Sequence, residues 1–373
     1  MENKKKKISF TQSKSFDAIM AAVMAAVLGL IFGFIVMLIA NPDKAVKGFQ
    51  TILIGGAGRM PDVFYYATPI LMTGLAVAFA YKMGMFNIGA SGQFTMGIYM
   101  AMYVGFMVDL PPGLHCLAAV LAGMIGGMIW GFIPGFFKAY LNVNEVITSI
   151  MFNYIGMYLV DMLVQKNSVM YVSSKTRTDY LPASVQLPAL GFKNSNVNIA
   201  IIIAIIIAII CFIVLYKTTF GYELRATGFN KFGAMYAGMN SRKNIILTMV
   251  IAGAMAGLGG AFTILAPSSI AGSSMTYEPV NIIASEGFDG IAVALLGSAH
   301  PIGTIFAAIF IAFIKCGGTL ASLYGFKPEI IDVVIAIIIY FSAFASFMSM
   351  IFKEKISGLF RKKEKQPAED AGA

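Results

Sequence analysis

The chain has 373 residues, of which 58% are hydrophobic and 12% are charged, and its mean hydropathy is +0.79. This composition excludes an ordinary soluble domain and is typical of a polytopic membrane protein. The formal net charge of +9 comes mainly from lysines and arginines in the tails and loops. Membrane topology and anionic lipid explain these residues more simply than nucleic acid, which is not an expected partner.

Apolar runs predict an all-α transmembrane helix bundle of about ten spans, since each span needs roughly 20 mostly apolar residues. They lie near residues 17–40, 64–82, 88–108, 114–137, 146–164, 199–216, 244–266, 282–298, 302–316 and 329–352. The third, eighth and ninth are rich in glycine and interrupted by polar residues. We expect broken or re-entrant helices there, because irregular backbone at membrane depth needs protein or water around it.

The basic residues also predict an orientation. With ten spans, most of them fall on one side of the membrane, which the positive-inside rule makes cytoplasmic together with both termini. Three basic residues between positions 44 and 59 fall outside and oppose this model. The expected parts are a cytoplasmic basic tail (1–16), a transmembrane domain (17–352), an outer loop (165–198), a cytoplasmic loop (217–243) and a cytoplasmic tail (353–373).

Glycines recur at intervals of four in three of the predicted spans. Small residues at this spacing share one helix face and let two helices approach closely in lipid. We expect them to pack helices within the bundle rather than to join two subunits. They are Gly29 and Gly33, Gly123, Gly127, Gly131 and Gly135, and Gly253 and Gly257.

A first polar cluster follows the second predicted span and contains Asn87, Ser91 and Gln93, with Phe86 beside them. Each polar group would lose several kcal/mol of hydration in lipid unless it found a partner. These side chains are therefore expected to face protein or a water-filled path. A hydrogen bond between helices and a contact to a transported substrate remain equal alternatives.

A second polar cluster opens the fifth predicted span. Asn144 is a predicted N-cap, and Glu145 suits the positive end of the helix that follows. Asn153 lies deeper and is a candidate for the pathway, with Tyr154 next to it. The outer loop 165–198 beyond this span is interpreted as a solvated connector, with contact to an extracellular protein as the alternative.

The cytoplasmic loop carries a regular apolar pattern between its polar residues. Leu224, Phe232, Met235 and Met239 recur every three to four residues along most of this stretch. This spacing predicts a short amphipathic helix on the membrane face that gathers all four on one side. Such a side could bury against a soluble subunit.

Two carboxylates form the third cluster, in the eighth predicted span. Glu286 and Asp289 are three residues apart and so share a helix face. Carboxylates inside a span are by default functional, and the alternative is an ion pair with a lysine or arginine.

Enzyme signatures are missing from the sequence. It has two histidines but no zinc-protease pair, and it has neither a phosphate-binding loop for nucleotides nor a nucleophile elbow. Its three cysteines, Cys116, Cys211 and Cys316, lie in apolar runs without paired spacing, so no metal site or disulfide is expected. The sequence therefore gives no support for an intramembrane enzyme.

Together, the three clusters and the loop resemble the membrane permease subunits of bacterial ABC importers for nucleosides and simple sugars, relatives of the branched-chain amino acid and ribose permeases. Residues 67–93 and 144–155 are similar to signatures of the nucleoside branch. The resemblance makes 217–243 the coupling loop that contacts the ATPase. Its assigned residues are Glu223, Leu224, Arg225, Gly228, Asn230, Tyr236 and Gly238.

The resemblance also implies partners and a location. ATP and Mg²⁺ would bind a separate ATPase subunit, an extracellular lipoprotein would deliver the substrate, and a second, different permease would complete a heterodimer in the bacterial cell membrane. No cofactor is expected in this chain. The sequence departs from the family at Ser91, where glutamate is usual, and in the loop at Phe229 and Lys231.

A nucleoside needs amide and hydroxyl partners together with apolar or aromatic surface. The candidate pathway residues are Phe86, Asn87, Ser91, Gln93, Asn153, Tyr154, Glu286 and Asp289. A simple sugar such as ribose needs many of the same groups and is an alternative substrate. A second alternative is an ion-coupled secondary transporter with Glu286 and Asp289 as coupling carboxylates, although such a carrier does not need the ordered loop.

Overall fold

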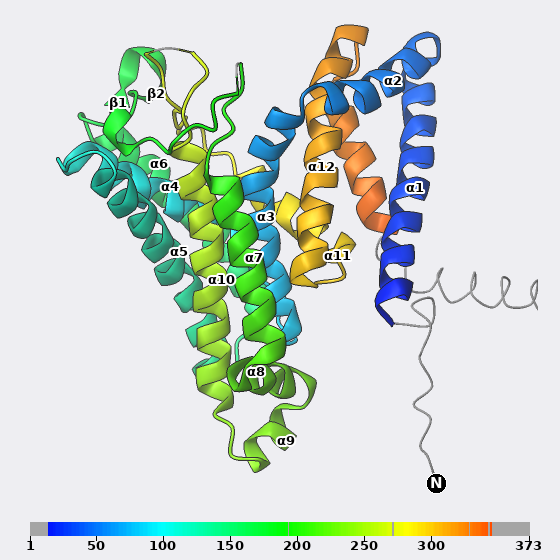
Figure 1. The fold of residues 1–373 in the computed structure, drawn as a ribbon. Coiled ribbons are helices and arrows are strands. Elements are labelled where there is room, and N and C mark those ends of the chain that lie inside the picture. Colours follow the sequence, from blue (N-terminus) through cyan, green and yellow to red (C-terminus); the bar gives the residue numbers. More distant parts are fainter. Residues whose placement is uncertain (1–13, 193, 271, 328, 342–343, 345–373) are drawn as a thin grey trace, which may run out of the picture. The chain divides into compact units, whose positions relative to one another are not determined.

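The computed structural model describes residues 14–192, 194–270, 272–327, 329–341 and 344, and for residues 14–22 it describes the backbone alone. The chain divides into two compact units (Figure 1). One comprises residues 1–46 and 326–373, and the other residues 47–325.

The first unit pairs α1 (Lys14–Ala40) with a helix over residues 329–341. A Cβ atom on Gly29 would lie 2.6 Å from the Ile338 Cα atom, and one on Gly33 would lie 2.6 Å from the Val334 Cγ1 atom. These contacts confirm that this glycine pair packs helices within the chain. The predicted span 329–352 continues beyond the described residues.

Helix α2 (Pro42–Gly58) runs from the first unit into the second and was not predicted. We interpreted its charged first half as part of a loop. The sequence nevertheless carries a helix start, since Pro42 is the first helical residue and Asp43 lies in the first turn.

The second unit is a bundle centred on two buried helices, α3 (Met60–Lys82) and α10 (Ser241–Ile264). Helix α3 packs against α10, α11 and α12, and α10 also packs against α4 and α5. The remaining helices are α4 (Ala90–Met107), α5 (Leu114–Leu141), α6 (Glu145–Lys166), α7 (Ala200–Lys217), α8 (Thr219–Phe229), α9 (Lys231–Tyr236), α11 (Ser285–Leu296) and α12 (Pro301–Ala321).

Within the described residues, seven helices are long and apolar enough to cross a membrane. They are Val23–Ala40, Met60–Lys82, Leu114–Leu141, Glu145–Lys166, Ala200–Lys217, Ser241–Ile264 and Pro301–Tyr324. The all-α membrane bundle is therefore confirmed, and seven of the ten predicted spans coincide with these helices. The side of the membrane on which each terminus lies stays a prediction.

Two other predicted spans are shorter or less apolar. Helix α4 covers most of 88–108 but begins with Ser91 and Gln93 among its first residues. The span 282–298 is wrong as a crossing helix, because α11 has 12 residues and follows a non-helical stretch over 272–284. The interrupted helix expected in this region is what the structure contains.

The outer loop is hydrogen-bonded to the bundle, and many of its residues are exposed. A short hairpin of β1 (Tyr171–Val172) and β2 (Arg177–Thr178) lies at the end of this unit opposite α8 and α9 (Figure 1). The Thr178 amide donates to the Tyr277 carbonyl at 2.9 Å, and the Tyr277 amide donates to Thr178 Oγ1 at 2.9 Å. The non-helical stretch before α11 is therefore tied to the loop.

A buried carboxylate on α6 fixes the same stretch. Asp161 accepts hydrogen bonds from the Tyr277 hydroxyl at 2.6 Å and from the Asn281 amide at 2.7 Å. Asp161 was not among the predicted site residues, although it is a lone carboxylate within an apolar span, which is a signal for a paired or functional group.

Helices α5 and α10 meet along a seam of glycines. A Cβ atom on Gly127 would overlap the Gly253 carbonyl and lie 2.7 Å from the Gly257 Cα atom. On Gly131 it would lie 3.0 Å from the Gly253 Cα atom. The seam confirms that these glycines pack helices within the bundle.

We expect Gly127→Ala to lower the free energy of unfolding by about 1 to 3 kcal/mol, because the added methyl group forces two backbones apart. Thermal unfolding of the purified protein in detergent measures the effect. Gly58→Ala is the matched control, since nothing lies within 4 Å of a Cβ atom there. Equal unfolding temperatures for both variants would contradict a tight seam.

Candidate transport pathway and coupling surface

Asn87 and Gln93 bind each other at the start of α4. The Asn87 Nδ2 atom donates to Gln93 Oε1 at 2.9 Å, and Gln93 Nε2 donates to Asn87 Oδ1 at 3.1 Å. Both side chains are buried. The reciprocal pair stabilises the turn that leads from α3 into α4.

Asn153 ties α6 to the same turn. Its Oδ1 atom accepts from the Gly92 amide at 2.8 Å, and its Nδ2 atom donates to the Ile88 carbonyl at 2.9 Å. Gly92 lies in the first turn of α4, where backbone amides lack partners within the helix. Asn153 thus caps α4 from a neighbouring helix. Asn144 caps α6 as predicted, with its Oδ1 atom 2.8 Å from the Val146 amide.

Two buried hydroxyls in this region differ from the amide side chains in their hydrogen bonding. Within the described residues, the Oγ atoms of Ser91 and Ser149 are buried and have no hydrogen-bond partner. A Cβ atom on Gly89 would lie 3.3 Å from Ser149 Oγ and 3.2 Å from Asn87 Oδ1, so Ser149 belongs to the same cluster. A buried hydroxyl without a partner costs about 1 to 3 kcal/mol, so each needs an explanation.

Helix α11 lies directly against Ser91. A Cβ atom on Gly287 would overlap Ser91 Oγ and lie 2.5 Å from the Ser91 Cα atom. On Gly290 it would lie 2.7 Å from the Thr73 carbonyl carbon. Helices α11, α3 and α4 are therefore in backbone contact, and a glutamate at position 91 would not fit this packing.

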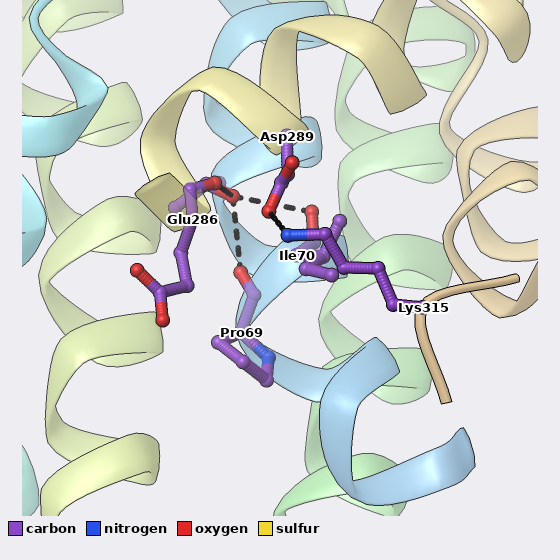
Figure 2. Close-up of polar contacts among 6 residues, drawn as sticks. Pro69, Ile70, Glu286, Asp289 and Lys315 are labelled. Carbon is purple, nitrogen blue, oxygen red and sulfur yellow. Dashed lines mark hydrogen bonds and ion pairs between the residues drawn. The ribbon is translucent and has the colours of Figure 1, made fainter. Parts of the chain in front are cut away.

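Figure 2 shows how α11 is held to α3 and α12. The Thr73 hydroxyl lies 2.7 Å from the Glu286 carbonyl, 3.1 Å from the Pro69 carbonyl and 3.2 Å from the Ile70 carbonyl. This hydroxyl bridges α3 to the first turn of α11.

The two carboxylates of α11 have different surroundings. The Asp289 carboxylate forms an ion pair with the Lys315 ammonium on α12. The Glu286 carboxylate points away from this pair (Figure 2). The ion-pair alternative is therefore confirmed for Asp289. Lys315 was missed, although it is the one charged residue in the predicted span 302–316.

The other two candidates lie apart from these polar groups. Phe86 is half-buried before α4. Tyr154 is 49% exposed on a face of α6 that also carries Met151 and Tyr158, so the structure does not bring it together with Asn153. Its place in the pathway stays a prediction.

The predicted amphipathic helix of the coupling loop is wrong, because the loop contains two helices. The chain breaks at Asn230, whose Oδ1 atom accepts from the Gly233 amide at 2.9 Å and so caps α9. Leu224 is fully buried against the bundle, whereas Phe232 and Met235 are exposed. The four apolar residues therefore do not share one side.

Exposed apolar residues at the end of α8 and in α9 form a different set, which we call the aromatic face. It comprises Phe229 (96% exposed), Phe232, Met235 and Tyr236 (94% exposed). At the end of α9, Gly238 adopts the left-handed conformation with φ +83°, which favours glycine. Helices α8 and α9, which carry these residues, lie at one end of the bundle, beyond α7 and α10 (Figure 1).

The other loop residues contact the bundle. A Cβ atom on Gly228 would lie 2.7 Å from the Met83 Cα atom, so α8 rests on the end of α3. The Arg225 guanidinium carbon lies 5.0 Å from the centre of the Tyr216 ring on α7. Glu223 is partly exposed.

A bundle in which seven described helices are long and apolar enough to cross a membrane defines an integral membrane protein. Residues 59–343 match the family described as "Branched-chain amino acid transport system / permease component". The chain belongs to this family of ABC transporter permeases.

Several relatives are similar over most of their length. The guanosine ABC transporter permease protein NupP of Bacillus subtilis is 37% identical over 83% of this chain and 88% of its own. The nucleoside ABC transporter permease protein NupB of Lactococcus lactis is 36% identical over 83% of this chain and 86% of its own. The glucose ABC transporter permease protein TsgB13 of Haloferax volcanii is 27% identical over 77% of each chain. No solved structure matches.

We expect Lys315→Met to lower the free energy of unfolding by about 2 to 3 kcal/mol, because it removes the cation beside a carboxylate at membrane depth. Thermal unfolding in detergent measures it. In the double variant Asp289→Asn with Lys315→Met, much of the loss is expected to return, since neither charge remains. Additive losses would show that the ion pair contributes no coupling.

Proposed function

We propose that the chain is a permease subunit of an ABC importer that takes up nucleosides and hydrolyses ATP on a separate subunit. The observation that carries this proposal is the 36–37% identity to two nucleoside permeases, each covered over more than four-fifths of its length. The sequence has no phosphate-binding loop of its own, which supports placing ATP and Mg²⁺ on a partner.

The aromatic face supports docking to that ATPase on the cytoplasmic side. Aromatic residues are enriched where protein interfaces gain most of their affinity. Leu224 and Gly228 pack on the bundle and so hold α8 in place, while the exposed side chains of the aromatic face are free to enter a partner.

The pathway residues divide by their contacts. Asn87, Gln93 and Asn153 are bound within the chain, so they shape the site. Among the residues that the structure describes, Ser91 and Ser149 carry the buried hydroxyls without partners, and they are suited to bind a polar group of the substrate when α11 and α4 separate. A nucleoside offers ribose hydroxyls and ring nitrogens for such bonds.

Two alternatives receive different support. A simple sugar as substrate has some support, because TsgB13 is a glucose permease. The identity of TsgB13 to this chain is lower than that of the two nucleoside permeases. An ion-coupled carrier has little, since Asp289 is paired with Lys315 and the family belongs to ABC systems.

The remaining partners are part of the same proposal. A second, different permease would complete the pathway, and an extracellular lipoprotein would deliver the nucleoside. The hydrogen-bonded outer loop supports docking of the lipoprotein, because an ordered surface is better suited to docking than a flexible one. The cell membrane holds the assembly.

The test is uptake by the assembled complex. The chain is co-expressed with the permease, ATPase and binding protein encoded beside it, and uptake of radiolabelled guanosine, uridine and ribose is measured. We expect nucleoside uptake that stops when the ATPase Walker lysine is mutated. Ribose uptake alone would favour the sugar importer, and uptake that ignores the ATPase mutation but follows an ion gradient would overturn the proposal.

We expect Ser91→Ala to raise the nucleoside concentration for half-maximal uptake about tenfold, because one hydrogen bond to the substrate is lost. The unfolding temperature should stay equal or rise, since the variant removes a buried hydroxyl without a partner. Thr95→Val is the control, because that hydroxyl is bound to the Ser91 carbonyl at 2.9 Å. Unchanged uptake by Ser91→Ala would leave serine at 91 with a packing role alone.

We expect the double variant Phe229→Ala with Tyr236→Ala to weaken ATPase binding at least about 30-fold, since two exposed anchors are truncated. Retention of the ATPase during affinity purification measures it. Leu323→Ala, which truncates an exposed side chain just after α12, is the control. Full retention by the double variant would place the docking surface elsewhere.

A further inference from the structure

A chain of ring contacts joins the coupling loop to the turn between α11 and α12. The His300 ring, at this turn, stacks on the Tyr216 ring with centres 5.3 Å apart and planes inclined by 29°. The Phe212 ring, which lies on α7 together with Tyr216, has its centre 5.4 Å from that of the His300 ring. The Arg225 guanidinium of α8 lies over Tyr216. The consecutive helices α7 and α8 thus meet the distant turn at His300 around one tyrosine.

The turn itself has an unusual backbone. Ser298 and Ala299 have φ of +55° and +49°, in the left-handed region that disfavours residues with a Cβ atom. The Ser298 amide bonds the Leu295 carbonyl at 2.9 Å, and the Ala299 amide bonds the Ala294 carbonyl at 2.7 Å. This is the Schellman arrangement, in which glycine usually takes the place of Ser298. Surrounding contacts are needed to hold such a turn.

One of these contacts comes from α3. The Lys82 ammonium donates to the Ser298 carbonyl at 3.3 Å, and Lys82 is the last residue of α3. Burial and the Lys82 charge lower the pKa of His300, so its ring is neutral at pH 7. Lys82 on α3 and Tyr216 on α7 lie near the ring, and Arg225 on α8 contacts Tyr216. A neutral ring can stack between these groups without adding a third cation.

The turn directly follows α11, the helix that covers Ser91. Gly287 of α11 lies against Ser91, and the Thr73 hydroxyl bonds the Glu286 carbonyl. The Asp289–Lys315 ion pair joins α11 to α12. The two helices and their turn therefore form one hairpin, and a displacement at its tip would reach the buried hydroxyl.

We propose that His300 and Tyr216 are positioning residues that transmit movement of the coupling helix α8 to the α11–α12 hairpin. This inference rests on the proposed function. In it, Arg225 of α8 contacts Tyr216 on α7, Tyr216 contacts His300 at the hairpin tip, and the hairpin opens or closes access to Ser91. The stack contacts neither substrate nor nucleotide. Its effect is on the coupling between nucleoside transport and ATP hydrolysis.

The test measures coupling in the reconstituted complex, as nucleoside transported per ATP hydrolysed in proteoliposomes. We expect His300→Leu to lower this ratio about fivefold or more, the lower end for coupling between distant sites, with basal ATPase activity retained. His300→Phe keeps a flat ring against Tyr216 and should keep most of the ratio. Phe306→Leu, an exposed aromatic residue of α12, is the matched control and should change nothing.

A double-mutant cycle separates the relay from a general loss of structure. Tyr216→Leu and His300→Leu act through one contact, so the double variant should lose no more coupling than the stronger single variant. Wild-type coupling in His300→Leu, or additive losses in the double variant, would overturn the relay. If wild-type complex shows no nucleoside-dependent ATP hydrolysis, it is the proposed function that fails.

Discussion

Backbone contact through glycine is the constraint on which the unit of residues 47–325 depends. In lipid, helices gain little from burying apolar surface, so close packing must hold them together. Gly127 and Gly253 provide this between α5 and α10, and Gly287 and Gly290 provide it between α11 and its neighbours. The second set has a further effect, because it places the short α11 against the polar start of α4.

The polar groups inside the bundle divide into those that build the site and those that are left for a ligand. Amide side chains such as Asn153 use donor and acceptor within the chain, and they fix the start of α4. The hydroxyls of Ser91 and Ser149 have no partner in the described part of the chain. Polar character alone does not separate these roles, whereas the bonding of each atom does.

Local patterns predicted much of the fold. Long apolar runs located seven spans, and Asn144 was identified as a cap from its neighbours in sequence. Partners distant in sequence were not predictable in this way. The Lys315 ion pair and the bonding of Asp161 depend on how α11 and the stretch before it return to the bundle, which no local pattern specifies. In the coupling loop, the cap at Asn230 overrode an apolar period that suggested one helix.

The contact between Ser91 and Gly287 ties two distant sequence positions to each other. A side chain larger than serine at 91, or larger than glycine at 287, would require α11 to lie farther from α4. The two positions should therefore vary together among relatives, with a bulky residue at one accompanied by a rearranged α11. Suppose that one of the two residues is exchanged alone between this chain and a relative with glutamate at 91. The new side chain would then lack the position of α11 that accommodates it.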